Sequence, residues 1–121
     1  MHLEETADQR ALRDELRAYF AQLLPPEVRA ELAADAEGGP VFRRLVKQMG
    51  TDGWLGIGWP EEFGGQGRPA TDQFVFFDEV QRAAAPFPFV TLNTVGPTLM
   101  SFGSDEQKKE FLPAIVAGEV N

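Results

Sequence analysis

The sequence of 121 residues contains no cysteine and a single histidine, His2. The lack of cysteine excludes disulfides, thiolate nucleophiles and zinc–thiolate sites, and it suits a reducing cytoplasm, which is the location we expect. His2 stands at the terminus without metal-ligand neighbours, so we predict that it is inert and that the chain binds no metal. The serine and threonine residues have no histidine or cysteine partner to activate them, so a self-contained hydrolase is not expected.

Basic side chains are also scarce, because eleven lysine and arginine residues stand against nineteen aspartate and glutamate residues and leave a net charge of −8. Such a chain repels polyphosphate backbones, so we expect no nucleic-acid partner. A long apolar run is missing, and the first residues have neither the basic nor the apolar region of a secretory leader, so we expect no membrane span. A composition of 43% hydrophobic and 25% charged residues is typical of one globular domain.

Apolar residues recur at helical spacing in six stretches, separated by proline, glycine or polar residues. Thr6 with Gln9, and Ser104 with Gln107, have the form of a capping box, which satisfies free backbone N–H groups at the start of a helix. The expected helices cover residues 7–24, 27–34, 40–50, 72–85, 92–102 and 105–117. We therefore predict an all-α fold, a single helical bundle of about five to six helices.

Two of these helices carry specific expectations. Asp72 is expected to cap the fourth helix, which would turn Phe74, Phe77 and Val80 toward the core. In the fifth helix, Pro97 is expected to produce a kink. The apolar stripe of that fifth helix consists of Leu92, Val95, Leu99 and Phe102.

The run from residue 54 to residue 69 is rich in glycine and proline, so we interpret it as an ordered loop. Glu61 and Glu62 lie in this loop as adjacent carboxylates, which can serve as acid and base but more often form a solvated edge or cap a helix. The glycines of the loop follow no strand and lack the lysine of a phosphate loop, so they are a weak signal for phosphate binding.

Phenylalanine is concentrated between residues 74 and 102, at Phe74, Phe76, Phe77, Phe87, Phe89 and Phe102. These rings could wall a slot for a long or polycyclic apolar ligand, although the pattern alone favours ordinary core packing. Lys108 and Lys109 could contact an anionic ligand, but in the first turns of a capped helix lysines are most often surface charges. The residues alone leave both questions open.

Two segments, WPEEFGGQG at 59–67 and FGSDEQKKEFLPAIVAGE at 102–119, together resemble the N-terminal helical domain of the acyl-CoA dehydrogenase family. Shorter segments fit the same register, namely DELRAYF at 14–20, MGTDGWLGI at 49–57 and FFDEV at 76–80. The resemblance covers nearly the whole chain. It implies an oxidoreductase of fatty-acid or lipid metabolism that desaturates the α,β bond of an acyl-CoA thioester.

The resemblance also implies how the full-length enzyme is divided. The N-terminal helical domain, residues 1–121 here, would precede a middle β domain and a C-terminal helical domain that this chain lacks. FAD is held mainly by those two domains and a neighbouring subunit, and the catalytic glutamate usually lies in the last domain. We therefore expect FAD in the full-length enzyme but none on this chain alone. No catalytic or cofactor-binding residue is carried over, and the isolated chain is expected to be inactive.

One substrate-binding feature is carried over by position, because family members pack part of the acyl chain against the end of the fourth helix and the fifth helix. The candidate residues for this acyl-pocket wall are Phe87, Phe89, Leu92, Val95 and Leu99. Acyl-CoA is then the expected substrate of the intact enzyme. The WPEEFGGQG loop is interpreted as a structural turn that holds the third and fourth helices together.

Other interpretations remain open. The chain could be a stand-alone binding or assembly module of a flavoenzyme complex, or the same domain from an acyl-CoA oxidase or a flavin monooxygenase. The sequence leaves undecided the acyl-chain length, a steroid-like against a linear substrate, and the electron acceptor. We expect the enzyme to be a homo- or hetero-oligomer. We also expect the domain to self-associate in isolation, because an apolar face would lose its cover.

Overall fold

The computed structural model describes residues 4–35 and 38–119, and within these ranges the chain is helical with no strand. The all-α prediction is confirmed, while His2 lies outside the described residues. Two short turns, the 3-10 turn η1 (Glu61–Phe63) and the π-helical turn η2 (Thr91–Val95), accompany the α-helices. The α-helices are α1 (Ala7–Leu23), α2 (Pro26–Ala34), α3 (Pro40–Thr51), α4 (Ala70–Ala83), α5 (Gly96–Phe102) and α6 (Asp105–Val116).

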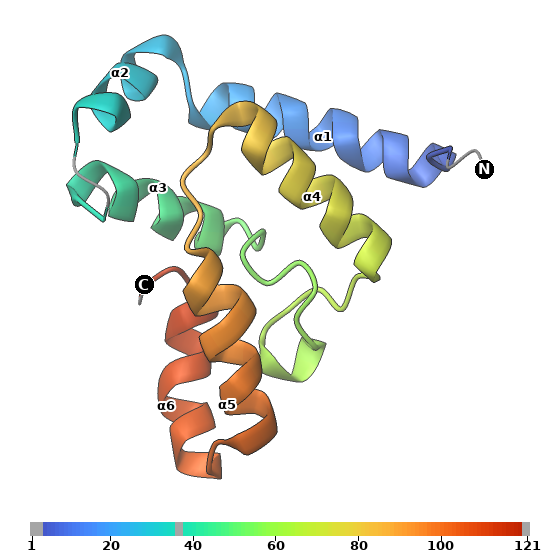
Figure 1. Cartoon of the computed structure of the whole chain (residues 1–121), viewed down its shortest axis with the longest axis vertical. Helices are drawn as coiled ribbons and strands as arrows, with labels where there is room; N and C mark the ends of the chain where they lie inside the picture. The colour runs from blue at the N-terminus through green and yellow to red at the C-terminus, as the bar shows by residue number, and fades with distance from the viewer. Residues whose placement is uncertain (1–3, 36–37, 120–121) are drawn as a thin grey trace.

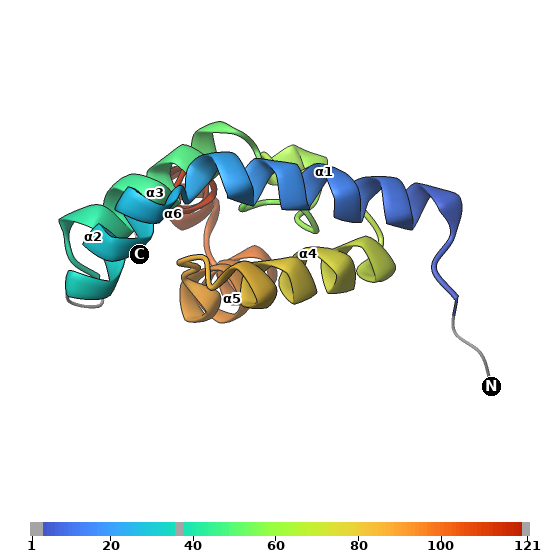
Figure 2. The same cartoon turned by 90° about the horizontal axis from the view of Figure 1, so that it is seen from above.

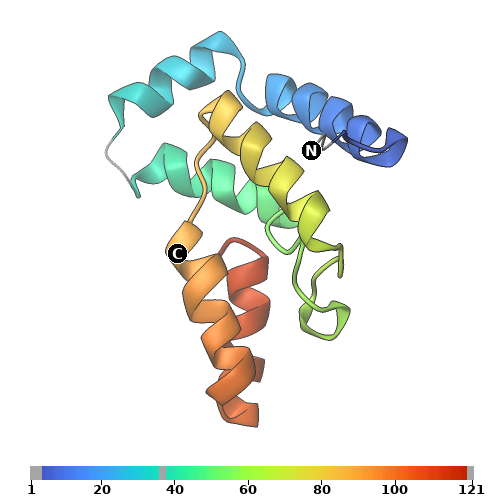
Figure 3. The same ribbon diagram turned by 45° about the vertical axis from the view of Figure 1, so that its right-hand side comes forward.

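The helices form two pairs joined by α3 (Figure 1). Helices α1 and α4 lie side by side and run in the same direction, as Figures 1 and 2 both show. Helices α5 and α6 form a hairpin at the other end of the molecule, which Figure 3 shows extending away from the α1–α4 pair. The C-terminal end of α6 lies directly against α3. A Cβ added to Gly50 would lie only 2.2 Å from the carbonyl oxygen of Ala117.

Both predicted capping boxes are present. The Thr6 hydroxyl accepts a hydrogen bond from the N–H of Gln9, whose side chain accepts one from the N–H of Thr6. Ser104 and Gln107 make the same two contacts at the start of α6. These helix starts are correct because a capping box acts within four residues and needs no tertiary partner.

The core lies where α1, α3, α4 and the loop between α3 and α4 meet. The stripe predicted for α1 faces inward, with Leu12, Leu16 and Phe20 buried. Trp54 stacks on Phe76 of α4 with ring centroids 6.1 Å apart, so the loop contributes aromatic surface to the core. The buried apolar residues are Leu12, Leu16, Phe20, Leu24, Leu45, Val46, Met49, Trp54, Leu55, Ile57, Trp59, Val75, Phe76, Val80, Phe87, Leu92, Leu112 and Ile115.

Two expectations for the fourth helix are wrong. Helix α4 begins at Ala70 after Pro69, so Asp72 lies inside the first turn and pairs with Arg68 at 3.5 Å instead of capping the helix. Phe74 is 68% exposed rather than directed to the core. Residues 74–77 are four consecutive apolar residues, so the pattern does not indicate which side of the helix faces the core. The inner face of α4 also includes the charged residue Glu79.

The fifth helix also differs from the prediction. Instead of one kinked α-helix, the chain forms the π-helical turn η2 and then α5, with Pro97 in the first turn of α5. The helical backbone continues from η2 into α5, so the proline leaves a carbonyl of η2 without its backbone donor. Val95 and Phe102, predicted on the apolar stripe, are 43% and 86% exposed.

Candidate functional site

The residues predicted to wall an acyl pocket lie in one continuous segment, which leaves α4 as an extended connection and enters η2 and α5 (orange in Figure 1). The structure places them at different depths. Phe87 and Leu92 are buried, and Leu99 packs partly buried against the core. Phe89 and Val95 are 40% and 43% exposed. The segment is therefore anchored by some of its apolar side chains and presents the others at the surface.

Four phenylalanine rings connect this segment to α4. Phe87 contacts Phe76 and Phe77 with centroid distances of 5.6 Å, and Phe89 packs edge-on against Phe87 at 4.6 Å. Such edge-to-face contacts are the arrangement that aromatic rings prefer. Phe76, Phe77 and Phe87 are thus core packing, and Phe89 stands at the exposed edge of the cluster.

The WPEEFGGQG loop reaches the same segment, which the sequence did not indicate. Trp59 is buried, and its indole N–H donates to the backbone carbonyl of Leu92 in η2 at 3.1 Å. A Cβ on Gly96 would lie 2.3 Å from the Trp59 ring, so η2 and α5 approach the indole as closely as a glycine allows. The loop contacts the proposed acyl wall directly, in addition to joining α3 to α4.

The backbone N–H groups of the glycine-rich end of this loop are already engaged. The N–H groups of Gly65, Gln66 and Gly67 donate to the carbonyls of Pro60, Gly56 and Trp59 at 3.1, 2.9 and 2.8 Å. A pyrophosphate group is bound by N–H groups that point outward and are free. The glycine run therefore does not fit the phosphates of a flavin cofactor. The adjacent carboxylates Glu61 and Glu62 lie exposed on η1.

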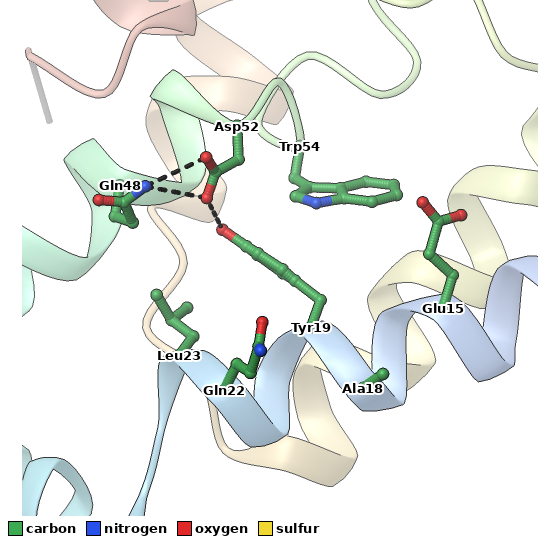
Figure 4. A pocket seen from close by; sticks show the side chains of 8 residues that line it. All are labelled: Glu15, Ala18, Tyr19, Gln22, Leu23, Gln48, Asp52 and Trp54. Atoms are coloured by element: carbon green, nitrogen blue, oxygen red, sulfur yellow. Dashed lines mark hydrogen bonds between the residues drawn. The ribbon is translucent and has the colours of Figure 1, made fainter.

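A groove of about 650 Å³ lies between α1 and the end of α3 (Figure 4). Tyr19 points across it and donates from its hydroxyl to Asp52 at 2.7 Å. The side-chain amide of Gln48 donates to the same carboxylate at 3.0 Å. Burial raises the pKa of Tyr19, and the hydrogen bond to Asp52 and the charge of Asp52 raise it further. The phenol therefore stays protonated at neutral pH.

A second groove, of about 350 Å³, separates η1 from α6. Lys108 and Lys109 line it together with Phe63 and Leu112. Glu62 also lines this groove and offsets part of the lysine charge. The groove combines apolar and mixed-charge surface, so the two lysines do not form a dedicated anion site.

An ion-pair network joins α1 to α4. Arg13 contacts Glu5, and its Nη1 lies 2.5 Å from Asp78 and 2.7 Å from the buried carboxylate of Glu79. Hydrogen bonds from Arg82 and Arg13 lower the pKa of Asp78, and the hydrogen bond from Arg13 lowers the pKa of Glu5. Arg17 pairs with Glu79 at 3.1 Å. Arg13 thus lies at the interface between α1 and α4.

Residues 4–35 and 38–119 include no cluster of three or more histidine, cysteine, aspartate or glutamate side chains able to hold a metal ion. Over the same residues, no helix has both the length and the apolar character that a membrane crossing requires. Of the residues predicted to wall the acyl pocket, Phe89 and Val95 are the ones exposed enough to contact a ligand.

Comparison with known families gives one assignment for nearly the whole chain. Residues 6–119 match the model of the acyl-CoA dehydrogenase N-terminal domain. Acyl-CoA dehydrogenase FadE26 of Mycobacterium tuberculosis is 51% identical over 125 residues, which cover 100% of this chain and 31% of that protein. Acyl-CoA dehydrogenase FadE29 of the same organism is 50% identical, with the same coverage. The chain thus spans about a third of the length of these relatives.

Solved structures agree with this assignment. The ChsE4–ChsE5 complex from Mycobacterium tuberculosis matches with a TM-score of 0.90 and 51% identity, over 100% of this chain and 30% of the matched chain. A structure described as Tcur3481–Tcur3483 steroid ACAD matches with a TM-score of 0.91 and 57% identity, over 99% of this chain and 31% of that chain.

Proposed function

Because the chain belongs to the acyl-CoA dehydrogenase family, as an N-terminal domain, we propose that it forms one wall of the acyl pocket in an FAD-dependent acyl-CoA dehydrogenase. The full-length enzyme would desaturate the α,β bond of an acyl-CoA thioester. The catalytic groups and the flavin would lie on domains outside this chain, since its glycine-rich loop does not fit the cofactor phosphates. The isolated chain would then be inactive.

The observation that carries the wall assignment is the segment from Phe87 to Val95. Its buried members, Phe87 and Leu92, fix the backbone to the core, while Phe89 and Val95 present apolar surface from a defined backbone. An acyl pocket needs this combination, because rigid apolar walls exclude water from the charge that develops during α-proton removal. An ordinary solvated helix surface would carry polar side chains at these positions.

We propose further that the acyl group is bulky and ring-bearing. Support comes from the 57% identity with a structure described as a steroid ACAD. Phe89 and Val95 offer ring and branched surface suited to flat polycyclic groups. One matched structure is described as a complex of ChsE4 with ChsE5, and the other is described as Tcur3481–Tcur3483. Both descriptions support a full-length enzyme that assembles with a second chain. A cytoplasmic location stays a prediction from the cysteine-free sequence.

Aspartate substitutions in the full-length enzyme test the wall. Phe89→Asp and Val95→Asp should each raise the dissociation constant for acyl-CoA by about tenfold or more, because a charge would face the apolar acyl group. The flavin content should stay near that of the wild type. Leu92 is unsuitable for this test because it is 1% exposed, so a charge there would disrupt the core.

Phe111→Asp provides a matched control, since Phe111 is 40% exposed like Phe89 but lies on α6. It should leave acyl-CoA binding near wild type. Loss of flavin with unchanged acyl-CoA affinity in the Phe89 or Val95 variant would contradict the proposed wall. Equal loss of affinity in all three variants would also contradict it.

A further inference from the structure

We propose that Trp59 is a positioning residue that fixes the π-helical turn η2 and thereby determines which acyl groups the pocket accepts. The proposal rests on the wall function described above. It assigns to the WPEEFGGQG loop a role in substrate selectivity.

The backbone of η2 leaves one carbonyl in need of a donor. The N–H of Gly96 donates to the carbonyl of Thr91, five residues earlier, as a π-helical turn requires. In that pattern the carbonyl of Leu92 would accept from residue 97, but Pro97 has no N–H. Leu92 is buried, and a buried carbonyl without a donor is costly. The indole N–H of Trp59 takes the place of the missing backbone donor at 3.1 Å.

The Trp59 ring is held firmly in this position. The backbone carbonyl of Trp59 accepts from the N–H of Gly67 at 2.8 Å, and its own N–H donates to Gly56 at 3.1 Å. A Cβ on Gly65 would lie 2.4 Å from the Trp59 Cβ, and a Cβ on Gly96 would lie 2.3 Å from its ring. Trp59 is therefore held by two close backbone approaches, one from its own loop at its Cβ and one from the start of α5 at its ring.

The π-helical turn sets the relative orientation of the wall residues. A π-helical turn holds one residue more than an α-helical turn, and one residue corresponds to a rotation of about 100°. If η2 changed to an α-helical path, residues before the turn, such as Phe89, would rotate relative to Leu99 after it. The wall would then present a different apolar surface. Trp59 favours one of these two arrangements without contacting the acyl group.

Trp59→Phe tests the role of the hydrogen bond, because it removes the N–H and keeps an aromatic ring. In the full-length enzyme, we expect the ratio of kcat/KM for a steroid-ring acyl-CoA over a straight-chain acyl-CoA to change by about tenfold. A general loss of folded protein would lower both values equally and leave the ratio constant. Trp54→Phe is the matched control, since Trp54 is also a buried tryptophan but stacks on Phe76.

Hydrogen–deuterium exchange of residues 91–99 measures the turn itself, independently of activity. We expect exchange in this segment to be about tenfold faster in the Trp59→Phe protein than in the wild type, and unchanged in the Trp54→Phe protein. Gly96→Ala should act like Trp59→Phe, because its methyl group would displace the indole. In the double variant the smaller phenylalanine ring leaves room for that methyl group, so the two effects should not add.

The outcomes separate the two proposals. Unchanged exchange in the Trp59→Phe protein overturns the positioning role of Trp59. Faster exchange with an unchanged selectivity ratio shows that Trp59 holds the turn but overturns its effect on selectivity. A wild-type enzyme that desaturates neither acyl-CoA overturns the proposed function, while the exchange data still decide whether Trp59 fixes the turn. Faster exchange together with a changed ratio supports both proposals.

Discussion

At the scale of single residues, Arg13 shows how a charged side chain can be part of a helix–helix interface. It contacts carboxylates on both sides of the α1–α4 pair, one of which, on Glu79, is buried. Removing one partner of a buried pair leaves an uncompensated charge, whereas replacing both with apolar groups is often neutral. The network therefore specifies the pairing of the helices, and its effect on stability depends on which member is removed.

Arg13→Met should lower the free energy of unfolding by about 3 kcal/mol, because Glu79 would keep only the more exposed Arg17 as its partner. The double variant Arg13→Met/Glu79→Leu should recover most of this loss. Arg44→Met is the control, since the Arg44–Glu31 pair is exposed and should contribute less than about 1 kcal/mol. Urea unfolding measures the free energy of unfolding of all three variants. Equal losses for Arg13 and Arg44 would show that the buried network contributes no more than a surface pair.

Tyr19 is the single tyrosine of the sequence, so its ionisation can be followed directly by absorbance at the tyrosinate band. Because burial, and then Asp52, raise its pKa above the ordinary value of 10.0, the folded protein should show no tyrosinate at pH 10. Tyr19 ionises at a lower pH in the unfolded chain, so its contribution to stability is complete below pH 10 and decreases as the pH rises above it. Asp52→Asn should lower the pKa of Tyr19 only in part, since burial is the larger cause. Half-ionisation of the native protein at pH 10 would contradict the packing shown in Figure 4.

At the scale of the helices, the contact between the end of α6 and α3 closes the bundle. Gly118 has a φ of 78°, and a Cβ on it would lie 2.6 Å from the carbonyl oxygen of Val46. Only glycine satisfies both the backbone angle and the close approach. The α5–α6 hairpin is therefore attached to α3 through the backbone itself.

Gly118→Ala should lower the free energy of unfolding by about 1–3 kcal/mol or more, since backbone strain is added to a steric clash. Gly38→Ala isolates the strain, because Gly38 has a φ of 77° and its added Cβ would meet nothing within 4 Å. Thermal unfolding of the two variants gives the difference between their losses of stability. If both variants lost the same stability, the contact between α6 and α3 would contribute nothing beyond the backbone angle.

The sequence predicted well those features that depend on nearby residues. Helix starts at Thr6 and Ser104 follow from local hydrogen bonds, and the inner stripe of α1 follows from clear spacing. The prediction for the inner face of α4 was wrong because a hydrophobic pattern does not predict a buried glutamate. Glu79 is buried because it pairs with Arg13, which lies 66 residues away in the sequence. The π-helical turn was missed for a similar reason, since its donor, Trp59, lies 33 residues before the carbonyl it contacts.

The candidate wall stays a prediction for the segment from Phe87 to Leu99, and the structure adds which of its members are buried. Residue type alone does not distinguish Leu92, which is buried, from Val95, which is 43% exposed. Their depths depend on the π-helical path of η2 and on the rings of α4. The family resemblance suggested the segment, whereas the depth of each side chain follows from tertiary packing.

At the scale of the whole molecule, the described surface carries large apolar side chains that a stable monomer would normally cover. Val90 is 69% exposed, and Phe102 and Phe74 are exposed to a similar or greater degree. We expect the purified chain to self-associate, and the Val90→Ser/Phe102→Ser variant to associate less. Sedimentation velocity over a range of concentrations measures this. A wild-type chain that remains monomeric at high concentration would contradict the expectation.

The parallel pairing of α1 with α4 has a consequence for biosynthesis. Two helices that run in the same direction cannot be joined by a short turn. The ribosome therefore synthesises α2, α3 and the following loop after α1 and before its partner α4. A nascent α1 on the ribosome therefore exposes Leu12, Leu16 and Phe20 until α4 has emerged. Chaperones that shield apolar helices should be needed most in that interval, and pauses in translation between α1 and α4 should lower the yield of folded protein.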